Sequence, residues 1–339
     1  MALHSERVQT RSPEPGKGDT VTADMTAGPV VDGGNPVRRP AGPSLLSKGA
    51  PYLLLLPAIV ATLALLGWPL VKTLLLSFQN MNKRQLILHL TEWNGFDNYT
   101  AQLSSSEFWH TAGRSVAFTL VNVILIMVFG TLTGLLLNRL GKKMRLFLSV
   151  GLIMAWAMPF VAQSTVFTWL FDSHYGVVNW GLDKLGWHSM ATYNWYSSQL
   201  STFFVIVLLI VWGSIPFVAF NTYAGLTTIP TELYEAARMD GAGSFKIFSA
   251  VIFPSLKPFF LGTTFLEIIW VFKCFTQVFT INNGGPERLT ETLPVYAFVE
   301  GMGNQHYGIG GAIAMLTIVM LGVAMTYYFR IIMKQEDEL

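Results

Sequence analysis

Two ionisable residues inside a long apolar stretch are the first candidates for chemistry. Glu267 and Lys273 lie in the run at residues 257–281, with Trp270 and Gln277. Ionisable groups in such a stretch are costly and mark functional sites. At about 100° per residue, the four side chains share one helix face about 120° wide. An aromatic ring beside hydrogen-bonding groups suits a sugar in a transport path. The alternative is a helix–helix contact in which the charged groups pair or snorkel.

Other reactive side chains form no catalytic or metal-binding pattern, so we expect no catalytic residue, metal or cofactor. Cys274 is the single cysteine of the chain, which excludes an internal disulfide. No GxxxxGK[ST] phosphate loop occurs, so ATP hydrolysis would need a separate partner subunit. All six histidines fall outside the apolar runs: His4, His89, His110, His174, His188 and His306.

The composition indicates a protein that is embedded in a membrane. Hydrophobic residues make up 52% of the 339 residues and charged residues 12%, with a mean hydropathy of +0.45. Soluble domains carry about twice that charged fraction. The net charge of +2 is too small to indicate a nucleic-acid partner, whereas membrane lipid is expected to surround the chain.

Six apolar runs are each long enough to cross a bilayer, because about 20 helical residues span its hydrocarbon core. Helices are required because lipid offers no partners to backbone polar groups. The sequence therefore predicts an all-α, polytopic protein in which residues 48–335 form a transmembrane domain. The expected spans lie near residues 51–78, 111–138, 147–171, 202–226, 257–281 and 308–333.

Residues 1–47 are rich in Gly, Pro, Ser, Thr and charge, and we expect them to be a disordered cytoplasmic tail. Lys and Arg concentrate in alternate connections, which predicts that both termini lie on the cytoplasmic side of the membrane. The densest of these connections contains Arg139, Lys142, Lys143 and Arg145. Residues 79–110, 172–201 and 282–307 are then external.

The predicted cytoplasmic connection at residues 227–257 reads as a helix–turn–helix rather than a flexible loop. Pro230 suits a helix start, Gly241 permits a sharp bend, and Pro254 is expected to end the second helix. Both helices carry an apolar face. Such a face beside water requires a partner or the lipid surface.

The spacing of this connection resembles the EAA loop of permeases in binding-protein-dependent ABC importers. Glu235-Ala236-Ala237 is followed by Gly241 and Pro254 at the intervals of that family. Val251 and Phe253 replace the family's Ile and Leu, and both are apolar. The resemblance implies that Glu235, Ala236, Ala237, Gly241 and Pro254 couple the chain to an ATP-binding cassette ATPase dimer.

Three further segments are similar to carbohydrate-uptake permeases, and the whole resemblance covers about residues 50–335. It places the chain with the maltose-transporter F-type or glycerol-phosphate A-type partner. It implies a second homologous permease subunit and an extracellular sugar-binding protein. The segments are Leu53 to Phe78, Trp169-Leu170-Phe171 with Tyr175-Gly176 and Asn179, and Phe272-Lys273 with Gly284-Gly285-Pro286 and Thr290-Glu291-Thr292-Leu293.

The alternative function is a secondary transporter of a small polar solute, driven by an ion gradient. Such proteins usually contain internal repeats, and none is visible between residues 50–200 and 200–335. A membrane-embedded enzyme is a weaker alternative because it would need more ionisable groups at one depth. Prolines 159 and 216 are expected to interrupt spans three and four. Four polar residues are expected to hold helices together: Asn122, Gln163, Ser164 and Asn221.

Overall fold

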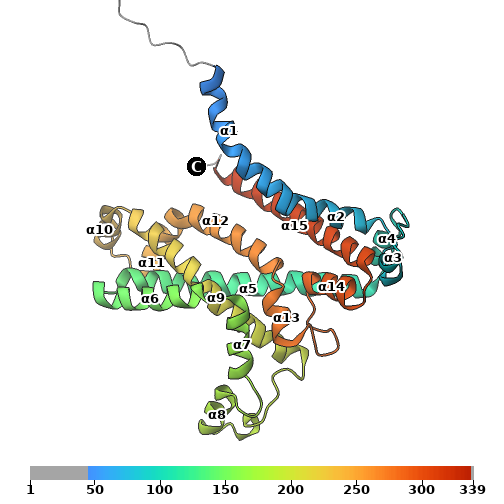
Figure 1. Cartoon of the computed structure of the whole chain (residues 1–339). Helices are drawn as coiled ribbons and strands as arrows, with labels where there is room; N and C mark the ends of the chain where they lie inside the picture. The colour runs from blue at the N-terminus through green and yellow to red at the C-terminus, as the bar shows by residue number, and fades with distance from the viewer. Residues whose placement is uncertain (1–44, 337–339) are drawn as a thin grey trace, which may run out of the picture. The chain divides into compact units, whose positions relative to one another are not determined.

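The computed structural model describes residues 45–336, and these are almost entirely helical (Figure 1). Within that range the β-structure is limited to two isolated bridges, Gln79 with Trp93 and Asn82 with His306. The all-α prediction is therefore confirmed. The α-helices are α1 Leu45–Thr62, α2 Trp68–Ser77, α3 Lys83–Ile87, α4 Asp97–Leu103, α5 Ser106–Arg139, α6 Lys142–Ala157, α7 Phe160–Leu170, α8 Val177–Lys184, α9 Gln199–Thr228, α10 Thr231–Met239, α11 Ser244–Ile247, α12 Phe253–Phe272, α13 Thr276–Asn282, α14 Leu293–Phe298 and α15 Tyr307–Glu336.

The chain divides into a unit at Met1–Val60 and a unit at Ala61–Leu339. In the first unit, the described part is the beginning of α1, which starts at Leu45. The predicted disordered tail at residues 1–47 lies almost wholly outside the described residues.

Five described helices are long and apolar enough to cross a membrane, and one bent helix pair would make a sixth. Each overlaps one of the six apolar runs in the sequence. The five are Leu54–Ser77, Ser106–Arg139, Gln199–Thr228, Ser244–Phe272 and Tyr307–Lys334, and the pair is Lys142–Ala157 with Phe160–Leu170.

The bent pair is broken at Pro159, where α6 and α7 meet at 101°. Met158 adopts an extended conformation, as expected for a residue before proline, and Pro159 itself cannot donate a backbone hydrogen bond. Pro159 thus turns the chain out of the direction of α6.

Three sequence expectations about helix ends are wrong. Pro216 does not interrupt its span, because α9 continues through it. Pro254 does not end a helix, because it occupies the first turn of α12. The fifth span ends at Phe272 rather than residue 281, so Lys273 and Gln277 do not continue the helix of Glu267 and Trp270.

Two π-helical segments explain how prolines are accommodated inside long helices. Leu63–Gly67 precedes Pro69, and Phe248–Ile252 precedes Pro254. A proline clashes with the carbonyl four residues before it. Widening the preceding turn relieves that clash, and the helix then continues with a local π-bulge.

Helices α5 and α9 form the central pair of the second unit, and glycines allow their close approach (Figure 1). A Cβ atom on Gly134 would lie 2.7 Å from the Cβ of Thr222. Gly130 stands one turn earlier against Val218. Small residues four apart permit such backbone contact in membrane helices. The pair supports a buried core that includes Ile126, Val205, Ile206 and Leu209.

Arg145 closes the turn between α5 and α6. Its guanidinium donates to the carbonyl oxygens of Leu137 at 2.9 Å and Leu140 at 2.8 Å, and to the Tyr223 hydroxyl at 2.7 Å. These bonds satisfy carbonyls at the end of α5 that have no helical partner. Arg145 therefore fixes α6 and α9 to the same end of α5.

Candidate functional site

The helix–turn–helix predicted within residues 227–257 is present, and its residues 230–254 are called the hairpin below. Helix α10 ends in a Schellman motif, in which Gly241 N–H donates to Arg238 O and Ala242 N–H to Ala237 O, both at 2.9 Å. Gly241 has a φ of +74°, which residues with a Cβ atom rarely adopt. The glycine therefore sets the sharp turn into α11.

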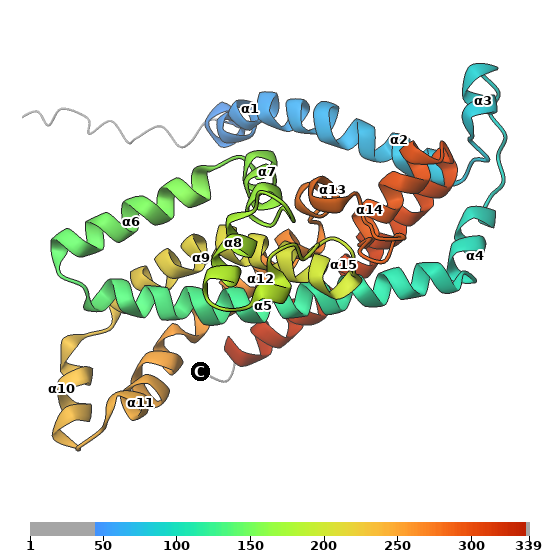
Figure 2. The same cartoon turned by 90° about the horizontal axis from the view of Figure 1, so that it is seen from below.

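The hairpin is anchored on one side and exposed on the other. Tyr234 and Ile252 pack against Leu226 and Leu256, at the end of α9 and in α12. The opposite side carries two large apolar groups, Met239 at 88% exposure and Phe245 at 84%. Figure 2 shows α10 and α11 projecting at the end of the second unit where α5 passes into α6.

The predicted coupling residues lie on this projection. Glu235 and Ala236 are exposed, Ala237 is half-buried, and Pro254 is exposed in the first turn of α12. Among the described residues, the Glu235 carboxylate has no ion-pair partner within the chain. An unpaired carboxylate beside exposed apolar groups is a surface suited to a partner protein with a basic, apolar groove.

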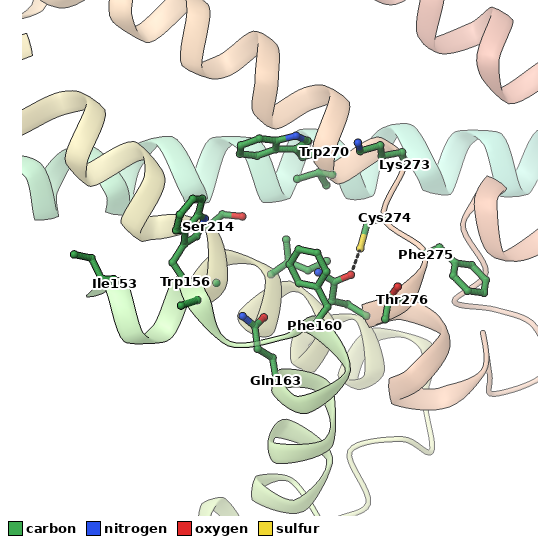
Figure 3. Close-up of a pocket in the computed structure, with 15 residues that line it drawn as sticks. Ile153, Trp156, Phe160, Gln163, Ser214, Trp270, Lys273, Cys274, Phe275 and Thr276 are labelled. Carbon is green, nitrogen blue, oxygen red and sulfur yellow. Dashed lines mark hydrogen bonds between the residues drawn. The ribbon is translucent and has the colours of Figure 1, made fainter. Parts of the chain in front are cut away.

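A cavity of about 590 Å³, called the central pocket, lies where two broken helices meet (Figure 3). One break is the bend between α6 and α7, and the other is the interval between α12 and α13. Helix α9 supplies the remaining wall. The aromatic lining residues are Trp156, Phe160, Trp270 and Phe275, and the polar ones are Gln163, Ser214, Lys273, Thr276 and Gln277.

Gln163 stabilises the first break. Its amide nitrogen donates to Met158 O at 2.9 Å and to Ala155 O at 3.2 Å, two carbonyls at the end of α6. Gly213 lies opposite, where a Cβ atom would be 3.1 Å from the Gln163 side-chain oxygen. Gln163 is therefore both a cap for α6 and a polar group of the central pocket.

The second break brings Lys273 and Gln277 into the pocket although they are not on α12. Lys273 caps α12, and the Cys274 thiol donates to the Gln277 side-chain oxygen at 3.0 Å (Figure 3). Within residues 54–334, whose side chains are described, the Lys273 ammonium has no ion-pair partner. It is available to a ligand hydroxyl.

The four predicted path residues are thus divided. Trp270, Lys273 and Gln277 line the central pocket, whereas Glu267 is fully buried behind the wall. Neither Glu267 oxygen has a well-formed hydrogen bond in the described chain, although Ser214 is close enough to interact with the carboxylate. The Trp270 ring packs against the Phe217 ring, with centroids 4.8 Å apart. Trp270 is still 38% exposed, so part of its ring is free to stack on a ligand.

Sequence reasoning missed Ser214 and Trp156 as pocket residues. Both lie in apolar helices far from α12 in the sequence. The 3.6-residue period shows which residues share a face of one helix, but it does not show which helices pack together around a pocket. Asn122, Ser164 and Asn221 were expected to hold helices together, but within the described chain their side-chain hydrogen bonds stay inside one helix. Their side chains donate to carbonyls four residues earlier in their own helices.

The connection between α13 and α15, called the arginine loop (residues 283–306), contains the densest ionic cluster of the described chain. Arg288 pairs with Glu107 at 3.2 Å, with Glu291 at 2.8 Å and with Glu300 at 2.9 Å. Its guanidinium also stacks over the Tyr296 ring at 5.3 Å. One cation therefore joins the start of α5 to three points of the loop.

The pKa values of this cluster reflect burial and charge together. Burial alone would lower the pKa of Arg288, but its three glutamate partners raise it above the ordinary value. Burial raises the pKa of Glu291 despite Arg288. Burial also opposes the charge of Glu300, yet hydrogen bonds from Asn304, Arg288 and His306 hold its pKa below the usual range. Arg288 therefore stays charged.

Comparisons with known proteins agree with the geometry. The pattern of the family "binding-protein-dependent transport system inner membrane component" matches residues 126–334. The chain is 58% identical to the diacetylchitobiose uptake system permease protein DasB of Streptomyces coelicolor, over 98% of this chain and 99% of that protein. It is 32% identical to the trehalose/maltose transport system permease protein MalF of Thermococcus litoralis, over 80% and 89% of the two chains.

A solved structure shares the fold. A chain in the crystal structure of a bacterial ABC transporter involved in import of the acidic polysaccharide alginate aligns with a TM-score of 0.73. The alignment covers 84% of this chain and 96% of that chain, at 17% identity. The helical arrangement is therefore retained where the sequences have diverged.

Proposed function

The chain belongs to the family of binding-protein-dependent transport system inner membrane components, and from this premise we propose that it forms half of a sugar path in an ATP-driven importer. Family membership makes it a multi-pass membrane permease and leaves the ion-gradient alternative without support. The observation that carries the proposal is the exposed hairpin bearing Glu235, projecting from a helical unit that encloses the central pocket.

The hairpin is the proposed contact with an ATP-binding cassette ATPase dimer. Met239 and Phe245 would fill an apolar groove on the ATPase, and Glu235 would pair with a basic group at its edge. The Schellman turn at Gly241 keeps the two helices at a fixed angle, so movement of the ATPase is transmitted to α12. The proposal includes a cytoplasmic location for the hairpin and for both termini.

The central pocket is the proposed sugar site. Its volume falls within the range of small-molecule sites, and its lining combines aromatic faces with neutral hydrogen-bonding groups and one cation, Lys273. Trp270 and Trp156 would stack on apolar sugar faces, while Gln163, Lys273 and Gln277 would bind hydroxyl and amide groups. Glu267 is proposed to hold the α9 wall through Ser214 rather than to contact sugar.

The similarity to the diacetylchitobiose permease favours an N-acetylated disaccharide as the substrate. An extracellular sugar-binding protein would deliver it, and a second homologous permease would complete the path. The test is uptake by the reconstituted complex from a panel of labelled sugars. We expect ATP-dependent uptake of diacetylchitobiose to exceed that of maltose and trehalose.

Trp270→Ala should reduce that uptake about tenfold or more, because it removes the proposed stacking surface. Trp93→Ala is a matched control, since Trp93 is an exposed tryptophan that does not line the central pocket. ATP-independent uptake by the wild-type chain, or equal effects of the two substitutions, would contradict the proposal.

A further inference from the structure

The arginine loop presents a surface whose shape is fixed from within. Asn283, Glu287 and Leu289 are exposed, whereas residues 290–293 are buried. The buried part is tied to α5, because Leu293 N–H donates to the Ser115 hydroxyl at 2.8 Å. The exposed tip therefore stands on a fixed base.

The same tip is also tied to the beginning of α9. Gln199 donates its side-chain N–H to Leu289 O at 2.8 Å, and Asn282 donates to Tyr196 O at 3.3 Å. The loop thus bridges the ends of α5 and α9. In the proposed orientation these are the external ends of both helices.

The backbone of the tip would not hold this shape unaided. Asn283, Glu287 and Arg288 have φ values of 48°, 47° and 64°, in the left-handed region that residues with a Cβ atom rarely adopt. Such conformations persist where surrounding contacts determine them. Hydrogen bonds from Gln199 and Thr290 hold parts of its backbone, and the ionic contacts of the tip all converge on Arg288.

The Arg288 guanidinium is suited to this role. Its Nε and Nη2 donate to the two oxygens of Glu291, at 2.8 and 3.1 Å. Nη2 also reaches Glu300, and Nη1 reaches Glu107. Glu291 is 1% exposed, so its charge requires a partner inside the fold. Lysine could supply the charge, but it could not form the planar, two-point contact.

We infer that Arg288 is a positioning residue that holds the arginine loop in the shape required to dock the loaded binding protein. The inference rests on the proposed function. It assigns the exposed tip at Asn283, Glu287 and Leu289 to the docking surface and assigns Arg288 to its support. Arg288 itself is only 38% exposed and is occupied by three carboxylates.

The test is transport by the assembled complex, measured against increasing concentration of sugar-loaded binding protein. Arg288→Gln should raise the half-saturating concentration about tenfold with little change in the maximal rate, because the loop still exists but is no longer held in shape. Arg288→Lys should recover part of that loss. The matched control is Arg84→Gln, an exposed arginine in another predicted external segment with no ion pair in the described chain.

A double-substitution cycle distinguishes positioning from direct contact. If Arg288 acts through the loop, Arg288→Gln and Glu300→Gln should be non-additive, because each removes the same support. Backbone hydrogen exchange in residues 284–292 should accelerate in both variants and stay unchanged in Arg84→Gln.

An unchanged half-saturating concentration in Arg288→Gln, or an equal shift in Arg84→Gln, would overturn the inference. If Arg288→Gln does not assemble, Glu107→Gln decides, because Glu107 is half exposed and belongs to the same cluster. It should raise the half-saturating concentration about threefold, and no shift would overturn the inference. A wild-type complex that ignores binding protein would instead overturn the proposed function.

Discussion

Helix α10 of the hairpin and the arginine loop lie outside the candidate spanning helices, yet the chemistry of the two surfaces is opposite. Glu235 of the hairpin has no ion pair within the described residues, and Met239 and Phe245 are exposed. The arginine loop satisfies its own charges, since Arg288 pairs with three carboxylates. One surface is therefore incomplete without a partner, whereas the other is shaped before a partner arrives.

The largest expected effect concerns the incomplete surface. Glu235→Arg should reduce ATP-coupled uptake about a hundredfold, because a repulsive charge would replace half of a buried pair at the proposed ATPase contact. The purified permease should unfold at an unchanged temperature, since Glu235 has no ion pair within the described chain. The measurement is uptake together with ATPase activity in proteoliposomes.

Glu232→Arg is the control for that prediction, because Glu232 carries the same charge in the first turn of α10. It should cost about 1 kcal/mol or less through the helix dipole, with much smaller loss of uptake. If Glu235→Arg leaves uptake intact, the hairpin is not the coupling surface.

The next effect concerns the surface that is shaped in advance. Gly284→Ala should destabilise the chain by about 2–4 kcal/mol, because φ is +83° and a Cβ atom would lie 2.5 Å from Glu291 Cγ. Gly303→Ala in the same loop is the control, since its Cβ would meet Val299 at an ordinary 3.7 Å. Unfolding midpoints in detergent measure both, and similar midpoints would count against a rigid loop.

The corresponding glycine of the hairpin should be more tolerant. Gly241→Ala is expected to cost about 1 kcal/mol, because φ is +74° but nothing lies within 4 Å of the added Cβ. Gly243→Ala should be nearly neutral, since Gly243 has equal space and an extended conformation. A larger midpoint loss for Gly241→Ala than for Gly284→Ala would reverse the proposed contrast.

The smallest effect is the pH dependence of the arginine loop. Because the pKa of Glu291 is raised in the folded protein, the folded loop binds a proton at a higher pH than the unfolded chain does. The contribution of Glu291 to the stability of the folded state therefore increases as pH falls through that raised pKa. The lowered pKa of Glu300 acts oppositely, and its contribution is lost only below the unfolded value of about 4.3.

In Glu291→Gln, the protection of residues 284–292 against backbone hydrogen exchange should therefore differ less between neutral and mildly acidic pH than in the wild-type protein. Glu300→Gln should leave that change in place while accelerating exchange at every pH above about 5. Identical pH profiles for the two variants would show that the carboxylates do not differ as described.

The sequence predicted features whose cause is local. Gly241 indicated the hairpin turn, because a left-handed residue ends a helix wherever it occurs. Long apolar runs predicted the spans for a similar reason. Pro159 indicated the bend between α6 and α7, although Pro216 shows that a proline need not break a packed helix.

Features with a long-range cause were not predictable in this way. No Gly or Pro marks the end of α12 before Lys273, so the pattern suggested one stripe from Glu267 to Gln277. Ser214 and Trp156 join the central pocket only through tertiary packing. Arg288 pairs with Glu107 although the two residues are far apart in the sequence, and no spacing rule connects those positions.

The central claim is that the hairpin is gripped by a separate ATP-hydrolysing subunit, and site-specific crosslinking tests it most directly. A photo-activated group replacing Phe245 should form an adduct with the ATPase in native membranes, while the same group replacing Trp93 should not. An adduct from the Trp93 position, or a Phe245 position that reaches only lipid, would contradict the account.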